Sequence, residues 1–171
     1  MRRVLALGAL AVALAGPAAA RAQTAVTGAR VSITTSALTI GQQRDLIFGT
    51  VLPGVPVTVN GRSANAGQFQ INGTRNAEIA VTMTLPTQLS TGVWTMPVAF
   101  GANSGCWRRQ PAQGGCTFWD PSTVLVRRIR NQNPPNDHFF VWIGGTVTPS
   151  ATQHTGVYWG TITMSVVYTG N

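Results

Sequence analysis

Charged residues are scarce in this sequence, and lysine is absent. Only 9% of the chain is charged, and all twelve of its basic residues are arginine. Glycine, threonine, valine and asparagine are plentiful instead, with 19 glycines among 171 residues. This composition is typical of a β-sandwich and argues against a helical bundle.

Groups that carry acid–base chemistry are equally few. After residue 22 the chain holds four carboxylates and two histidines: Asp45, Glu78, Asp120, Asp137, His138 and His154. No two carboxylates stand at short spacing, so paired-carboxylate hydrolysis is not expected. The sequence also lacks a Gly-x-Ser-x-Gly elbow and the His-Glu-x-x-His and Cys-x-x-Cys metal spacings. We therefore expect no enzyme activity and no cofactor or metal.

Cysteine occurs only twice, at Cys106 and Cys116. In an exported protein, two cysteines ten residues apart favour a disulfide over a redox pair. Closing so short a loop stabilises the fold by about 2–3 kcal/mol in the chain-entropy model.

The N-terminal residues have the pattern of a secretion signal. Arg2 and Arg3 precede an apolar run over residues 4–15, which Gly16 and Pro17 end before it reaches the length of a membrane span. Small residues at 20 and 22 offer a cleavage site. We expect residues 1–22 to be a signal peptide and the mature protein to be exported, to the periplasm, the cell surface or the medium. We find no second long apolar run in the mature chain and therefore expect no membrane span there.

The rest of the chain consists of short apolar segments separated by turn residues. This spacing predicts one domain over residues 23–171, an antiparallel β-sandwich or barrel with about seven to nine strands. The strands are expected at residues 31–40 (broken near 36), 46–51, 57–59, 68–71, 77–85, 96–100, 139–143, 145–147 and 156–168. Asn60-Gly61 and Asn72-Gly73 have the composition of hairpin turns, and Gly144-Gly145 that of a bend or bulge.

The last predicted strand shows a clear period of two. Apolar side chains alternate there with Thr161, Thr163 and Ser165, as in a strand with one buried face. The apolar set is Ile162, Met164, Val166 and Tyr168, which we take as the candidate edge of a groove.

A series of short motifs runs along nearly all of the mature chain. They are Leu46-Ile-Phe-Gly49, Val57-Thr-Val59, Gly67-Gln-Phe69, Ile71-Asn-Gly73, Ile79 to Pro86, Met96-Pro-Val98 with Phe100, Ile143-Gly-Gly-Thr146, Gly156-x-Tyr158-x-Gly160-Thr161 and Val166-x-Tyr168. In order and spacing this series resembles the bacterial secreted family known as domain of unknown function 4402, which is similar to pilin-like and spore-coat-type β-sandwiches. The resemblance implies a structural subunit without catalytic residues. Residues 105–137, with both cysteines, exceed the family pattern and form a variable insertion.

An assembly subunit of pilin type is completed by an N-terminal strand from a neighbour, which adds to an open sheet edge. Ala29, Val31 and Ile33 alternate with polar residues as such a donor strand requires. The same pattern describes the first strand of a sandwich that is complete by itself, so both interpretations stay open.

Arginine and aromatic residues gather in the insertion and just after Cys106. Five of the nine arginines that follow residue 22 lie between positions 108 and 130. The candidate ligand-binding residues are Trp107, Arg108, Arg109, Trp119, Arg127, Arg128 and Arg130. Charge and stacking of this kind suit an acidic polysaccharide, the phosphates of lipopolysaccharide or a nucleic acid. The plainer interpretation is a disulfide-pinned loop whose arginines are solvated, and nucleic acid is not expected as a ligand of an exported protein.

The composition, the strand pattern and the resemblance together predict an exported antiparallel β-sandwich of immunoglobulin-like or pilin-like type. We expect it to be a structural subunit of a bacterial surface fibre or coat. Its expected partners are further copies of itself or related subunits, together with a periplasmic chaperone. The alternative is a monomeric secreted or periplasmic module that binds an acidic glycan through its arginine-rich loop.

Overall fold

The computed structural model describes residues 37–130 and 138–170, which form twelve β-strands and no helix. The strands are β1 (Thr39–Arg44), β2 (Val57–Val59), β3 (Gly67–Asn72), β4 (Glu78–Thr84), β5 (Gln88–Thr91), β6 (Trp94–Ala99), β7 (Gly105–Arg108), β8 (Thr117–Trp119), β9 (Leu125–Arg128), β10 (His138–Ile143), β11 (Gly145–Val147) and β12 (Thr163–Tyr168). The predicted all-β class is therefore confirmed. The described part of the chain contains no helix with the length and hydropathy of a membrane span. The expected signal peptide, residues 1–22, lies outside the described residues.

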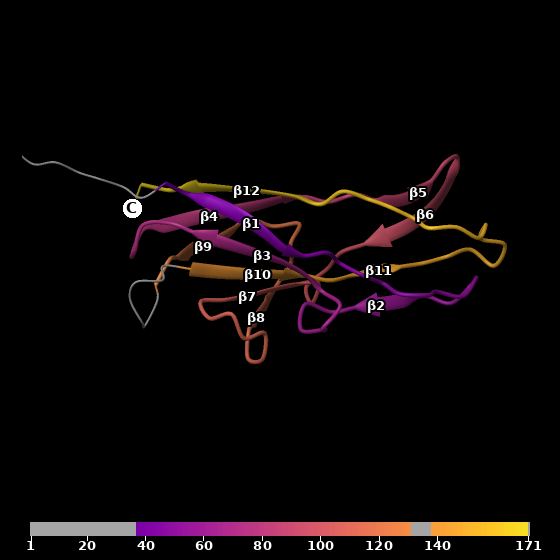
Figure 1. The fold of residues 1–171 in the computed structure, drawn as a ribbon, viewed down its shortest axis with the longest axis horizontal. Helices are drawn as coiled ribbons and strands as arrows, with labels where there is room; N and C mark the ends of the chain where they lie inside the picture. Colours follow the sequence, from indigo (N-terminus) through magenta and orange to yellow (C-terminus); the bar gives the residue numbers. More distant parts are fainter. Residues whose placement is uncertain (1–36, 131–137, 171) are drawn as a thin grey trace, which may run out of the picture. The chain divides into compact units, whose positions relative to one another are not determined.

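The strands form three antiparallel sheets (Figure 1). One has five strands in the order β1-β3-β10-β7-β8, a second has the order β2-β11-β6-β5, and the third has the order β12-β4-β9. The number of strands exceeds the seven to nine expected. Four strands were not expected: β5, and β7, β8 and β9 from residues 105–137, which were expected as a loop. One expected strand, over residues 46–51, is absent.

The five-stranded and three-stranded sheets enclose the main apolar core, as the two layers of a sandwich do. Fully or nearly buried side chains from both sheets meet there: Ile71, Phe139, Val141 and Ile143 from the first, and Ile79, Val81, Leu125 and Met164 from the second. These residues alternate along their strands, so the period of two in the sequence marks the face that each strand turns inward.

Strand β10 is buried on both faces. Its odd-numbered residues face the main core, whereas Phe140 and Trp142 pack into a second cluster with Cys106, Cys116 and Ala66. A strand that is covered on both faces has apolar residues at every position. This explains why residues 139–143 are all apolar.

The chain passes from one sheet to another at Gly144. β11 follows β10 directly along the chain (Figure 1), but β10 belongs to the five-stranded sheet and β11 to the sheet of β2 and β6. Only Gly144 lies between the two strands. A Cβ on Gly144 would lie 1.9 Å from the carbonyl oxygen of Val59. Glycine is required there because the backbone of β2 leaves no room for a side chain.

Both predicted Asn-Gly hairpins are wrong. The strands on either side of Asn60-Gly61 and of Asn72-Gly73 belong to different sheets and do not pair with each other. Neither glycine has a positive φ. A Cβ on Gly61 would lie 2.7 Å from Cβ of Cys106, and one on Gly73 would lie 2.7 Å from the Tyr168 hydroxyl. Close packing, not turn geometry, accounts for these two glycines.

Two expected strands differ in extent. Residues 46–51 form no strand, because their half-buried Leu46 and Phe48 pack against apolar clusters without entering a ladder. The strand expected over 156–168 begins only at Thr163. Before it, Trp159 makes a single bridge to Ser90.

Candidate functional site

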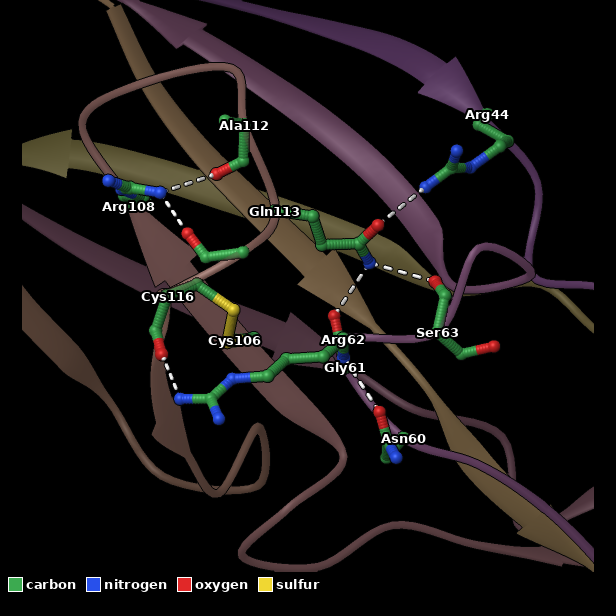
Figure 2. The surroundings of a disulfide bond; sticks show 11 residues. Arg44, Asn60, Gly61, Arg62, Ser63, Cys106, Arg108, Ala112, Gln113 and Cys116 are labelled. Atoms are coloured by element: carbon green, nitrogen blue, oxygen red, sulfur yellow. Dashed lines mark hydrogen bonds between the residues drawn. A yellow bond between two sulfur atoms is a disulfide. The ribbon is translucent and has the colours of Figure 1, made fainter.

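The predicted disulfide joins Cys106 on β7 to Cys116, with a Cα–Cα distance of 5.7 Å (Figure 2). Both half-cystines are buried, at 0% and 1% exposure. They pack beside Trp142 of the second cluster, so the bond is part of the core and not a staple on an exposed loop.

The loop between the two cysteines is fastened to residues 60–63 by side-chain hydrogen bonds (Figure 2). Gln113 Nε2 donates to the carbonyl oxygens of Gly61 and Ser63, both at 2.8 Å. Arg62 Nη2 donates to the carbonyl oxygen of Cys116 at 2.6 Å, and Arg62 also lies over the Phe118 ring at 4.3 Å. These contacts hold the loop in one place relative to β7 and β8.

Trp119 is a correction to the candidate ligand-binding set. Its side chain is only 8% exposed and belongs to the main core. Its Nε1 donates to the carbonyl oxygen of Thr123 at 3.1 Å. The ring also covers Gly105, where a Cβ would lie 2.4 Å from Trp119 Cε3. Trp119 therefore secures the chain between β8 and β9 and is not available to a ligand.

Trp107 lies at the border between the core and the arginine-rich surface. Its indole ring stacks on buried Phe139, with centroids 5.4 Å apart and planes inclined by 12°. Arg127 Cζ lies 4.7 Å and Arg109 Cζ 5.9 Å from the indole centroid. The indole Nε1 is buried and has no hydrogen-bond partner among the described residues. Two guanidinium groups thus lie over the ring and are held there by cation–π attraction.

Arg109 and Arg127 also cover the free edge of β9. Arg127 Nη1 donates to the carbonyl oxygen of Val126 at 2.7 Å, and Arg109 Nε donates to that of Arg128 at 3.3 Å. β9 pairs with β4 through alternate residues, so these two carbonyls point away from the sheet. Arginine side chains therefore occupy the positions where another strand would bind.

Arginines surround a surface hollow of about 710 Å³ next to Trp107. Its lining residues are Arg75, Asn76, Trp107, Arg108, Arg109, Gln110, Gly115, Thr117 and Arg130. The structure thus brings together Trp107, Arg108, Arg109 and Arg130 of the predicted set, with Arg127 over the indole. Arg128 is not in the lining, and its Nε lies 3.8 Å from Glu78 Oε2.

Sequence reasoning missed Arg75 and Asn76, which join the hollow from the connection between β3 and β4. The structure places Asn76 in a turn with a φ of 62°, a conformation that asparagine tolerates better than most residues. Asn76 N–H donates to the carbonyl oxygen of Ile129 at 2.7 Å, which ties this turn to the end of β9. No spacing in the sequence relates residue 75 to residue 108.

The predicted groove-edge residues lie on β12 and just before it. Met164 is buried, whereas Ile162, Val166 and Tyr168 are half-buried against the main core. β12 is the outermost strand of its sheet and pairs with β4 from Thr163 to Tyr168 without a register shift. None of its six residues is charged.

The hydrogen-bond pattern shows which backbone groups of β12 face outward. Thr169 N–H donates to the carbonyl oxygen of Glu78 at 3.0 Å, so positions 169 and 78 form a hydrogen-bonded pair. Hydrogen-bonded and non-hydrogen-bonded pairs alternate along an antiparallel ladder. Met164 and Val166 therefore direct their N–H and C=O groups away from β4, where no strand of the described residues pairs with them.

The other sheet edges of the described residues are short or interrupted. β2 and β8 have three residues each. The register of β1 shifts between Gln42 and Arg44, and β5 is covered by the two hydrogen bonds that Ser90 makes with Trp159. Short strands, irregular registers and covering segments are how proteins protect sheet edges from pairing. β12 is the one regular six-residue edge in the described part without such protection. The candidate donor residues Ala29, Val31 and Ile33 lie outside the described residues.

The acidic and imidazole groups do not converge. Asp120 Oδ1 accepts hydrogen bonds from the Ser122 hydroxyl at 2.7 Å and from its backbone N–H at 2.9 Å, which together hold the pKa of the carboxyl below its ordinary value. His154 stacks on Trp94 with centroids 4.8 Å apart, while His138 contacts the side chains of Asn72 and Gln70. Within residues 37–130 and 138–170, no three His, Cys, Asp or Glu residues gather as metal ligands do.

No protein-family model matches this chain, and no curated protein or solved structure is significantly similar to it.

Proposed function

We propose that this protein is an exported structural subunit of a bacterial surface fibre or coat, which assembles by β-strand addition at the outer edge of β12. The observation that carries the proposal is the contrast between the two edges of one sheet. Arginine side chains cap the outward carbonyls of β9, whereas the outward groups of Met164 and Val166 on β12 have no such cover from residues 37–130 and 138–170. A flat, uncharged and regular edge strand is a site for pairing with another chain.

The occupant we propose is the N-terminal segment of a second copy. Ala29, Val31 and Ile33 offer three alternating apolar side chains. Added next to β12, such a strand would bond the outward backbone groups and place its apolar side chains beside half-buried Val166 and Ile162. Backbone hydrogen bonds would supply affinity, and the alternating side chains would set the register.

A subunit with this edge needs protection before it assembles. An uncovered edge strand can pair with the wrong partner during export. A periplasmic chaperone would prevent this by covering the edge until assembly. The location that follows is the periplasm during transit and the cell surface or the medium afterwards.

The first test is a substitution at the outward backbone of β12. Val166→Pro removes an N–H that the ladder with β4 does not use, and the extended conformation of the preceding residue is compatible with proline. Val166→Ala is the matched control, because it also loses the buried side chain but keeps the N–H. Unboiled denaturing gels of the exported protein should show a ladder of multimers for wild type and Val166→Ala. For Val166→Pro we expect a folded monomer.

A deletion of residues 23–35 separates addition between chains from pairing within one chain. If the segment is a donor, the deletion variant should fold when a wild-type copy supplies the strand and should form no multimers alone. An unfolded deletion variant beside a wild-type protein that runs only as a monomer would show that the segment is an internal strand, and would overturn the proposal.

A further inference from the structure

We propose that the hollow beside Trp107 binds an acidic polysaccharide through its oxyanion groups. This inference is independent of the assembly proposal, because the hollow is lined by β7 and by the connections around residues 75, 115 and 130, and β12 takes no part in it. The argument starts from the balance of charge around the hollow.

Four arginines line the hollow, and no carboxylate of the described residues does. Arg128 lies two residues before Arg130 and has an acidic partner, Glu78. Neither Arg128 nor Glu78 belongs to the lining of the hollow. Like charges gathered around a concavity raise the local potential and concentrate anions there. The guanidinium fork suits planar or tetrahedral oxyanions, because it donates two parallel N–H bonds to them.

The arginines are partly fixed and partly free, as a binding site requires. Arg108 Nη1 donates to the carbonyl oxygen of Ala112 at 3.1 Å and to that of Gly114, and Arg109 Nε donates to that of Arg128. Arg75 and Arg130 are exposed and have no hydrogen-bond partner among the described residues. Two guanidinium groups anchored by backbone carbonyls and two without a partner in the described part of the chain combine a fixed geometry with donors that remain open to a ligand.

The aromatic residues decide between a glycan and a nucleic acid. Binding of single strands relies on open aromatic faces on which bases stack. Trp107 has Phe139 against its ring and Arg127 and Arg109 over it, while Phe139 itself is 0% exposed. Recognition by charge, without stacking, suits a chain of sugar carboxylates or sulfates.

The experiment measures binding of the full-length exported protein to octagalacturonate by calorimetry at about 50 mM salt, with neutral maltooctaose as the uncharged control. We expect the acidic octasaccharide to bind and the neutral one not to bind. Raising the salt to about 300 mM should weaken binding roughly tenfold, because exposed charges are then screened.

Single substitutions test the location. Arg75→Gln and Arg130→Gln should each weaken binding by about threefold to fivefold, which is typical of one exposed charge contact. Arg128→Gln removes the same charge from a side chain outside the lining and should change affinity by less than about 1.5-fold. Equal losses for Arg128→Gln would indicate diffuse attraction and overturn the site.

Three further results would also overturn the proposal. They are the absence of octagalacturonate binding at low salt, equal binding of maltooctaose, and tighter binding of an octameric single-stranded DNA that depends on Arg75 and Arg130. The last would assign the hollow to nucleic acid. Heparin octasaccharide serves as a second acidic probe, and stronger binding of it would assign the site to sulfated glycans within the same class.

Discussion

The two tryptophans near the disulfide, Trp107 and Trp119, have different roles at the scale of single residues. Trp119 Nε1 donates to the carbonyl oxygen of Thr123, whereas Trp107 Nε1 is buried without a partner in the described part of the chain. A buried donor without a partner carries a desolvation cost that nothing offsets. The indole of Trp107 is therefore retained for its ring, on which Arg127 and Arg109 lie.

This difference predicts unequal costs for the same substitution. Trp119→Phe should destabilise the protein by about 1 kcal/mol more than Trp107→Phe, because only the former loses a hydrogen bond and leaves the Thr123 carbonyl unsatisfied. Urea unfolding of the two variants checks this. Equal free energies of unfolding would contradict the assignment.

Asp120 predicts a specific response to acid. Hydrogen bonds from Ser122 hold the pKa of Asp120 below its ordinary value of 3.8 in the folded protein. A lowered folded-state pKa stabilises the fold above the unfolded-state pKa, and the contribution is lost as the pH falls through the folded-state pKa. Ser122→Ala should raise the pKa of Asp120 and reduce the stability that the protein loses in acid. Ser122→Thr is the matched control, because it keeps the hydroxyl. NMR titration of the Asp120 carboxyl measures it, and an unchanged pKa in Ser122→Ala would contradict the prediction.

At the scale of elements, the passage from β10 to β11 depends on one glycine. Gly144 must let β10 leave the five-stranded sheet while its backbone touches Val59 of β2. A side chain at position 144 would push the sheet of β2 away from the sheet of β10, although the continuous segment of β10 and β11 connects these two sheets.

Gly144→Ala should therefore cost about 3 kcal/mol or more, or prevent folding, as severe overpacking does. Gly101→Ala is the matched control. A Cβ at Gly101 would meet nothing within 4 Å, and Gly101 has no positive φ. Soluble yield and thermal unfolding of the two variants make the comparison. A stable Gly144→Ala protein would show that the sheets adjust more easily than their contact suggests.

At the scale of the whole molecule, each sheet combines strands that are distant in sequence. β3 pairs with β10 from Asn72 opposite His138, and β4 pairs with β12 from Ile79 opposite Tyr168. The long stretch of chain between two such strands must close into a loop before the strands can pair. Proteins with topologies of this kind therefore fold slowly.

Refolding of the disulfide-intact protein from urea should accordingly take milliseconds to seconds. Stopped-flow tryptophan fluorescence measures this rate. Refolding within microseconds would mean that local contacts dominate the folding barrier, against the pairing observed in the sheets.

The sequence by itself determined the all-β class, the buried face of β12 and the disulfide. Alternation of apolar and polar residues reports burial directly, as at Met164 and Val166, and two cysteines allow only one intramolecular pair. These are local properties, so a linear pattern carries them.

Only the tertiary structure decided which strands pair, which aromatic rings are covered, and which arginines share a surface. Asn60-Gly61 looked like a hairpin turn and proved to be a packing contact with Cys106. Trp119 looked like Trp107 and proved to be core. Arg75 joined the hollow from another connection altogether. Pairing and proximity depend on residues far apart in the chain, and no local pattern records which of those residues meet.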